Sequence, residues 1–152
     1  MHKTVTVLLV FFWFSANIHA EEPNLEQLAQ TYFQARLATQ QPGASETDLE
    51  AYLALLSENV GYEHKPYSLL AETNGGKQRM REGMTRYLGK NEAYDAELVS
   101  IATGHNAFSI QYKGTHVYRR GGEGPILTKH FNAMDVLEVE GGKISIIREY
   151  RK

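Results

Sequence analysis

From about Tyr94 onward, apolar and polar residues alternate with a period of two, which is the repeat of a β-strand. The alternation stops only at three short segments that contain glycine, at residues 104–106, 121–125 and 141–142. Long strands joined by tight glycine turns predict an antiparallel meander of four strands. Because long strands twist and coil, we expect this sheet to curve and to enclose space beneath whatever covers it.

The part of the chain before Tyr94 has mostly helical spacing. Asn24 and Ser45 each precede an apolar pattern with a helical period, and both residue types are preferred helix N-caps. The predicted elements are helices over residues 24–41 and 45–59, a short strand over residues 60–64 and a third helix over residues 80–88. Helices followed by a run of strands indicate an α+β domain in which helices cover one face of a curved sheet.

The N-terminal residues have the three-part layout of a secretory signal peptide. The uncharged apolar run 5–14 follows Lys3 and precedes a small residue, Ala20, ahead of two glutamates. Ten apolar residues are too few to span a bilayer, so we predict cleavage rather than a membrane anchor. We therefore expect export to a periplasm or the medium, with residues 21–152 forming a single domain.

Composition excludes several classes of function. The chain has no cysteine, which rules out disulfides, thiolate metal sites and a cysteine nucleophile. Its formal net charge is −2 and it has no long run of like charges, so neither nucleic acid nor an anionic membrane is indicated as a partner. Nucleotide cofactors are scarce outside the cytoplasm, and we therefore expect any activity to be cofactor-free.

Two segments, taken with the element order, resemble a known superfamily. They are Gly76–Arg81, which opens the third predicted helix, and the stretch from Met134 through Gly141-Gly142 to Tyr150. The chain resembles the nuclear transport factor 2-like superfamily, and within it the SnoaL-like group. The resemblance implies a cone, in which a bent antiparallel sheet wraps the helices around a deep pocket. Polyketide cyclases, ketosteroid isomerases, dehydratases, epoxide hydrolases and non-catalytic proteins share that fold, so the fold alone does not decide the activity.

The same resemblance suggests three catalytic residues. Asp135 stands where ketosteroid isomerases have the protonated acid of their oxyanion hole, and Tyr32 falls near their tyrosine donor. His64 falls where they have the general base, and histidine can take up and return a proton near neutral pH. Together these groups would stabilise an enolate and move a proton. The alternative for Asp135 is a buried acid paired with Arg119 or Arg148.

Four further residues are predicted to bind the ligand, namely Tyr62, Met84, His116 and Glu149. Tyr62 shares a strand face with His64 because the two residues are two apart. Glu149 lines up with the second acid of epoxide hydrolases. Those enzymes have an arginine where this chain has Ala133, which counts against epoxide hydrolysis and leaves the two carboxylates without a charge-balancing partner.

Three functional hypotheses remain open at this point. The first is an exported, cofactor-free enzyme for proton transfer, cyclisation, isomerisation or dehydration of a compact apolar carbonyl compound. The second is a non-catalytic module of the same fold that binds a small apolar ligand or forms a homodimer. The third is a structural dimer whose cone is filled by side chains. We expect no metal, because His64, His116 and His130 lack any metal-binding spacing.

Overall fold

The computed structural model describes residues 24–65 and 76–152, and the predicted signal peptide lies outside these ranges. The elements are α1 (Leu25–Gln40), α2 (Glu46–Leu53), β1 (Leu56–Lys65), α3 (Gly76–Thr85), β2 (Ala93–Thr103), β3 (Ala107–Arg119), β4 (Ile126–Glu140) and β5 (Lys143–Arg151). The predicted α+β class is confirmed. Within the described ranges, no helix has the length and apolar character needed to cross a membrane.

Both predicted N-caps are confirmed. The side chain of Asn24 accepts a hydrogen bond from the backbone N–H of Gln27 at 3.0 Å. Ser45 and Asp48 form a complete capping box, in which each side chain accepts from the backbone N–H of the other residue. These bonds satisfy N–H groups that have no partner inside the helix, and they fix where α1 and α2 begin.

The boundary between α2 and β1 differs from the prediction, which extended the second helix to Asn59. The helix ends at Leu53, and β1 already begins at Leu56. Leu56 pairs with Ile144 of β5, and the backbone N–H of Ile144 donates to the carbonyl of Leu55 at 3.0 Å. Pairing with a strand far along the chain thus overrides a helical apolar pattern that continues past the end of the helix.

The strands form one sheet in the order β1-β5-β4-β3-β2. The predicted antiparallel meander of β2, β3, β4 and β5 is confirmed. The first strand, β1, extends the sheet by pairing with β5 in parallel, which the alternation of residues does not predict. This pairing brings a strand from the first half of the chain beside the last strand.

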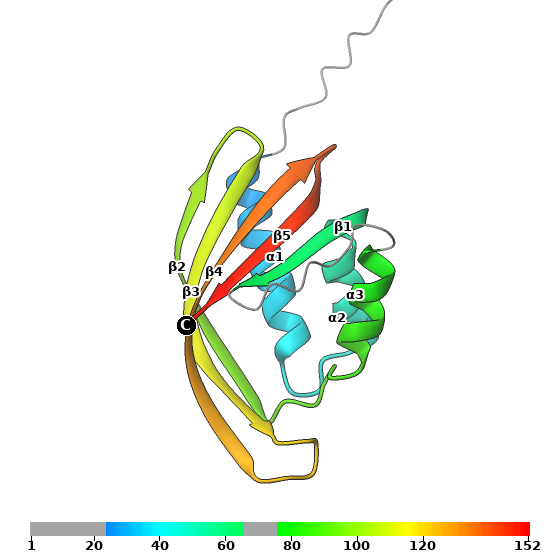
Figure 1. The fold of residues 1–152 in the computed structure, drawn as a ribbon, viewed down its shortest axis with the longest axis vertical. Helices are drawn as coiled ribbons and strands as arrows, with labels where there is room; N and C mark the ends of the chain where they lie inside the picture. Colours follow the sequence, from blue (N-terminus) through cyan, green and yellow to red (C-terminus); the bar gives the residue numbers. More distant parts are fainter. Residues whose placement is uncertain (1–23, 66–75) are drawn as a thin grey trace, which may run out of the picture.

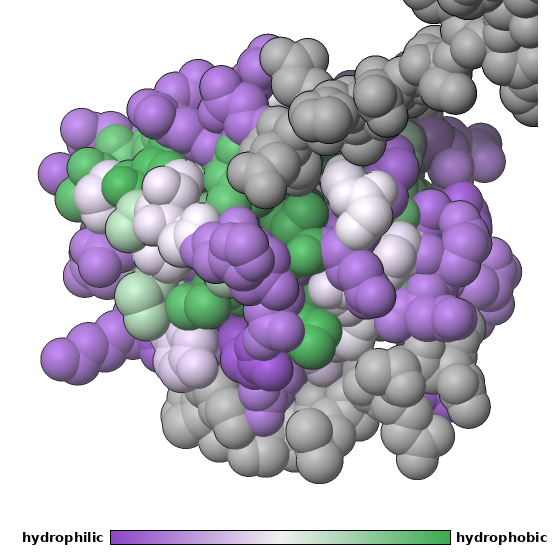
Figure 2. All heavy atoms as spheres, turned by 90° about the horizontal axis from the view of Figure 1, so that it is seen from above, coloured by the Kyte–Doolittle hydropathy of each residue, from purple (hydrophilic) through white to green (hydrophobic). Residues whose placement is uncertain are grey.

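The sheet is strongly curved, and all three helices lie on its concave side (Figure 1). Breaks in strand register between β1 and β5, β2 and β3, and β4 and β5 mark bulges that help the sheet to bend. The end of the sheet around the β3–β4 turn extends past the helices. Seen from above, polar residues form most of the coloured part of the rim, and apolar residues gather in the middle and at one side (Figure 2).

The core lies between α1, α2 and the concave face of the sheet. Its fully buried side chains include Tyr32 and Tyr52 from the helices and Phe108, Leu137 and Ile147 from the strands. The rings of Tyr32 and Tyr52 lie 5.7 Å apart, and the ring of Phe108 meets Tyr32 edge-on at 6.3 Å. The carboxylates of Asp135 and Glu149 are also buried at this face.

Candidate functional site

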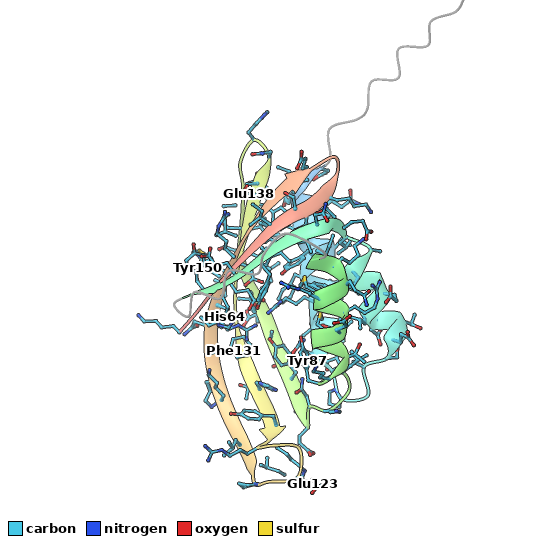
Figure 3. All side chains as sticks on the ribbon, turned by 45° about the vertical axis from the view of Figure 1, so that its right-hand side comes forward. His64, Tyr87, Glu123, Phe131, Glu138 and Tyr150 are labelled. Carbon is cyan, nitrogen blue, oxygen red and sulfur yellow. The ribbon has the colours of Figure 1, made fainter. Side chains whose placement is uncertain are left out.

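Three acid or base side chains lie in a row across three neighbouring strands. In the parallel pair, His64 of β1 is opposite Glu149 of β5, and in the antiparallel pair Glu149 is opposite Asp135 of β4. Residues that are paired in register point to the same face of a sheet. Burial of Glu149 and Asp135 shows that this is the concave face, and Figure 3 shows His64 between the sheet and α3.

Glu149 is surrounded by donors and cations. Its Oε1 lies 2.6 Å from a guanidinium nitrogen of Arg36, and its Oε2 lies 3.3 Å from Arg151 and 3.8 Å from Nδ1 of His64. The hydroxyl of Tyr62 also hydrogen-bonds this carboxylate. Burial alone would raise the pKa of Glu149, but Arg36, Arg151, Tyr62 and His64 together lower it. Glu149 therefore stays ionised at neutral pH.

Asp135 is fully buried and is held mainly by tyrosines. The hydroxyl of Tyr112 lies 3.1 and 3.2 Å from its two carboxylate oxygens, and the hydroxyl of Tyr32 donates to Oδ2 at 3.3 Å. The nearest cation is Arg36, whose Nε lies 3.6 Å from Oδ2. Burial raises the pKa of Asp135 to about 6, because Arg36 offsets the lost solvation only in part.

The two arginines proposed from the sequence as partners of Asp135 form ion pairs with other residues. Arg119 binds Glu92 at 2.6 Å, and Arg148 binds Glu138 and Glu63. Arg148 follows Ile147 and precedes Glu149, so strand alternation turns it to the opposite face from Asp135. Neither of these arginines forms an ion pair with Asp135 in the described part of the chain.

The charge-balancing arginine that the sequence argument missed comes from α1. Arg36 contacts Glu149 through one guanidinium nitrogen, and its Nε donates to the hydroxyl of Tyr112 at 3.2 Å and lies near Asp135. The expectation that Ala133 leaves the two acids without such a partner is therefore wrong. A signal was available, because Arg36 lies four residues after Tyr32 and so shares its face of the helix.

A cavity of about 430 Å³ opens beside this row of side chains. One wall is apolar and includes Met80 and Met84 of α3 and Val60 of β1. The polar end is formed by Arg36, Tyr62, His64, Glu149 and Arg151. The third hypothesis, a cone filled by side chains, is therefore wrong. The volume falls in the range of small-molecule sites.

Gly76, in the first segment that carries the family resemblance, shapes this cavity. A Cβ atom at Gly76 would collide with the backbone carbonyl of Val60, so only glycine lets the start of α3 pack so closely against β1. Both residues line the cavity. The glycine thus fixes the distance between the helix with the two methionines and the strand that contains His64.

The predicted site residues fall into three places. His64, Tyr62, Met84 and Glu149 all line the cavity. Asp135 and Tyr32 are fully buried and form a second layer behind Arg36, outside the set of described residues that line it. His116 lies in a separate hollow, where its Nε2 is 2.9 Å from Oδ1 of Asn91. The structure thus joins four of the seven predicted residues in one cavity.

Arg151 was not among the predicted residues, although it lines the cavity. Its side chain lies over the ring of Phe131, with the guanidinium carbon 5.8 Å from the ring centroid. Its Nε is buried and has no hydrogen-bond partner within the described ranges. An unsatisfied buried donor is costly. The Arg151 side chain as a whole is 27% exposed and brings a positive charge to the polar end of the cavity.

His130, the other strand histidine considered for a metal, is exposed and lies 3.0 Å from the hydroxyl of Thr115. Among residues 24–65 and 76–152, no three histidine, aspartate or glutamate side chains are arranged to hold a metal ion. The polar end can instead offer an imidazole, an ionised carboxylate and two guanidinium groups to a ligand.

Solved structures give a consistent picture of the fold. An LEH-like epoxide hydrolase of M. tuberculosis superposes with a TM-score of 0.61 at 21% identity, over 83% of this chain and 84% of that one. A candidate SnoaL-like polyketide cyclase of Shewanella putrefaciens gives 0.66 at 14% identity, over 86% and 91%. An NTF2-like protein of Anabaena variabilis gives 0.60 at 17% identity, over 84% and 88%.

No protein-family model and no curated protein sequence matches the chain. The similarity therefore lies in the three-dimensional arrangement of helices on the concave face of a curved, unclosed sheet. The chain has the nuclear transport factor 2-like fold that SnoaL-like proteins share.

Proposed function

We propose that the protein is a cofactor-independent enzyme that moves a proton on a compact, largely apolar carbonyl compound. Isomerisation, cyclisation and dehydration all begin with such a step. The observation that supports this proposal is the position of His64 at the polar end of the cavity, with Nδ1 3.8 Å from the buried, ionised Glu149. A carboxylate beside Nδ1 orients the ring and stabilises the imidazolium that forms on proton uptake.

In the proposed step, His64 removes a proton from the carbon next to the carbonyl group. The electrons of the broken C–H bond form a carbon–carbon double bond, and the electrons of the carbonyl π-bond move to its oxygen. Arg151, whose side chain is 27% exposed and lines the cavity, stabilises this enolate oxygen with its positive charge. The imidazolium then returns the proton to the same carbon or to a conjugated one.

Glu149 acts as a positioning residue in this scheme. Its carboxylate already contacts Arg36, Arg151 and Tyr62. These contacts lower the pKa of Glu149 and make it a weak base. Asp135 supports the site from behind, because it accepts a hydrogen bond from Tyr112, whose hydroxyl in turn accepts one from Nε of Arg36. The resemblance suggests that Asp135 stabilises the enolate oxygen. In this proposal Arg151 does so instead, because Asp135 has no exposed surface.

The test is exchange of carbon-bound hydrogen in D₂O, measured by NMR on cyclic ketones such as cyclohexanone. The wild-type protein should accelerate exchange next to the carbonyl, and His64→Gln should slow it about 100-fold or more. His130→Gln is the matched control, because this histidine is exposed and does not line the cavity. Equal exchange by the wild-type protein and His64→Gln would contradict the assignment.

Epoxide hydrolysis is the second candidate function. The observation that favours it is Arg36, which bridges Glu149 and Asp135 and supplies the charge balance that two neighbouring acids need. Styrene oxide is a suitable compact, apolar probe, and the product is its diol. Diol formation that is lost in Glu149→Gln and retained in His64→Gln would support this candidate over proton transfer. If the ketone and epoxide probes bind but neither is converted, the remaining hypothesis is the non-catalytic binding module.

A further inference from the structure

A second hollow, of about 490 Å³, lies between the turn after α3 and the sheet. Its walls come from the end of α1, from residues 86–91 and from the end of β3 with the glycine turn that follows. It contains His116, which was predicted to bind the ligand but does not line the first cavity. Nothing in the proposed reaction accounts for this hollow.

The two hollows adjoin. Gln40 and Tyr87 line both of them, and their side chains hydrogen-bond each other. Tyr87 retains 43% of its surface exposed, and Figure 3 shows it at the lower end of α3 on the side of the sheet. Gln40 of α1 and Tyr87 of the turn after α3 therefore lie at the boundary between the two hollows.

The second hollow differs from the first in its charge. Its charged lining residues in the described part of the chain are Arg86, Lys90 and Arg119, all of them cations. Arg119 is already paired with Glu92 at 2.6 Å. Arg86 and Lys90 are exposed, and the ammonium group of Lys90 donates a hydrogen bond of 2.6 Å to the backbone carbonyl of Arg86. The first cavity, by contrast, contains the ionised Glu149 beside its arginines.

The opposite wall of the second hollow is aromatic. The rings of His116 and Tyr118 lie 4.7 Å apart at an interplanar angle of 31°. Asn91 fixes the imidazole, because its Nδ2 donates to the carbonyl of Gln40 at 2.7 Å and its Oδ1 therefore faces Nε2 of His116. Burial, together with Arg151 and Lys129, lowers the pKa of His116 and favours a neutral ring.

We propose that the ligand carries, besides the compact apolar part that reacts, an extension that ends in an anionic group, and that it occupies both hollows. Its apolar body, with the reacting carbonyl, lies in the first cavity beside His64. The ligand passes Tyr87, and its anionic end lies between the aromatic wall and the cations Arg86 and Lys90. This inference rests on the proposed function for the placement of the carbonyl group, but the second binding region is argued from the lining of its own hollow.

The test compares two chain lengths and two end groups by isothermal titration calorimetry. The probes are decanoate and decan-1-ol, and their short counterparts hexanoate and hexan-1-ol. Wild-type protein should bind decanoate more tightly than decan-1-ol and show little preference between the short probes, which cannot reach from the first cavity into the second hollow. In the double variant Arg86→Gln/Lys90→Gln, decanoate affinity should fall about five- to tenfold, whereas decan-1-ol affinity stays within twofold.

The control is Lys113→Gln/Lys143→Gln, which removes two exposed cations that line neither hollow and should change no affinity. An equal loss of hexanoate and decanoate affinity in the test variant, unchanged decanoate affinity, or a wild-type protein that does not bind decanoate would each overturn the proposal. If the protein does not accelerate ketone exchange but binds decanoate as predicted, the proposed reaction is rejected and the binding site that spans the two hollows is supported.

Discussion

Asp135 and Glu149 face each other in register on neighbouring strands, both nearly or fully buried, yet their pKa values move in opposite directions. Burial raises the pKa of Asp135 to about 6, and Arg36 offsets this only in part. For Glu149 burial acts in the same sense, but Arg36, Arg151 and further donors outweigh it and lower the pKa. The difference comes from the partners: tyrosine hydroxyls around one acid, and guanidinium groups around the other.

The different partners give the two acids different roles. The acid with cationic partners faces the cavity and keeps its charge, whereas the acid with tyrosine partners lies behind and can hold a proton near neutral pH. Two acids whose environments push their pKa values apart can serve different functions in one site. Arg36 links them, because it contacts both.

The largest predicted effect follows from removing that link. Arg36→Met leaves two adjacent buried carboxylates with too little positive charge, and breaking such a buried pair costs about 3–5 kcal/mol of folding free energy. Chemical denaturation at neutral pH measures the loss. The loss should shrink at acidic pH, because Asp135 then takes up a proton and only one buried charge remains.

Arg81→Met is the control for this prediction. Arg81 also pairs with a carboxylate, that of Glu50 at 2.7 Å, but both groups are solvated. Its replacement should leave the denaturation midpoint nearly unchanged, since exposed pairs contribute little. A similar midpoint shift in both variants would mean that Arg36, which bridges Asp135 and Glu149, contributes no more to stability than an exposed ion pair does.

The next effect concerns pH and isolates Asp135. Its pKa in the folded protein, about 6, is above its ordinary value of 3.8, so the folded state binds the proton more tightly than the unfolded state. Stability therefore falls as pH rises through this window. Between pH 5 and 7.5 the wild-type protein should lose about 1–2 kcal/mol relative to Asp135→Asn, which cannot titrate there.

Glu149 does not obscure this measurement. Its pKa is lowered, so it contributes stability above the ordinary glutamate pKa of 4.5 and loses it only at more acidic pH. Its titration window thus lies below pH 5. If the difference in unfolding free energy between wild type and Asp135→Asn stays constant from pH 5 to 7.5, the contrast between the two acids is wrong.

The sequence predicts those parts of the fold that depend on local signals. The caps at Asn24 and Ser45 and the meander of β2 to β5 follow from side-chain type and from a period of two. The parallel pairing of β1 with β5 cannot be read in this way, because alternation says which face a residue occupies but does not name the partner strand. That pairing places His64 beside Glu149, so the centre of the site depends on a contact between the two halves of the chain.

The site residues show the same limit. Strand alternation correctly gives Tyr62 and His64 one face, but it carries no information on depth, which separates the cavity-lining Glu149 from the buried Asp135. Arg36 was missed because an arginine on an amphipathic helix is ordinarily solvated. Its burial depends on two acids more than 90 residues away in the chain.

The smallest predicted effects test the tyrosine side of the comparison. Tyr112 contacts both oxygens of Asp135 and accepts from Arg36, whereas Tyr32 makes one bond of 3.3 Å to this acid. Tyr112→Phe should therefore cost about 1 kcal/mol and Tyr32→Phe about half as much. The loss stays modest because Nε of Arg36, already 3.6 Å from Asp135, can move toward that acid.

The two variants should also differ in the titration of Asp135, followed by NMR of its carboxyl carbon. The hydrogen bond from Tyr112 lowers the pKa of Asp135, so its removal in Tyr112→Phe should raise that pKa above its wild-type value. Tyr32→Phe should move it less, because its single bond is longer. A fall in the pKa of Asp135 in Tyr112→Phe would show that Arg36 takes over from the hydroxyl completely, and the two acids would then share one kind of partner.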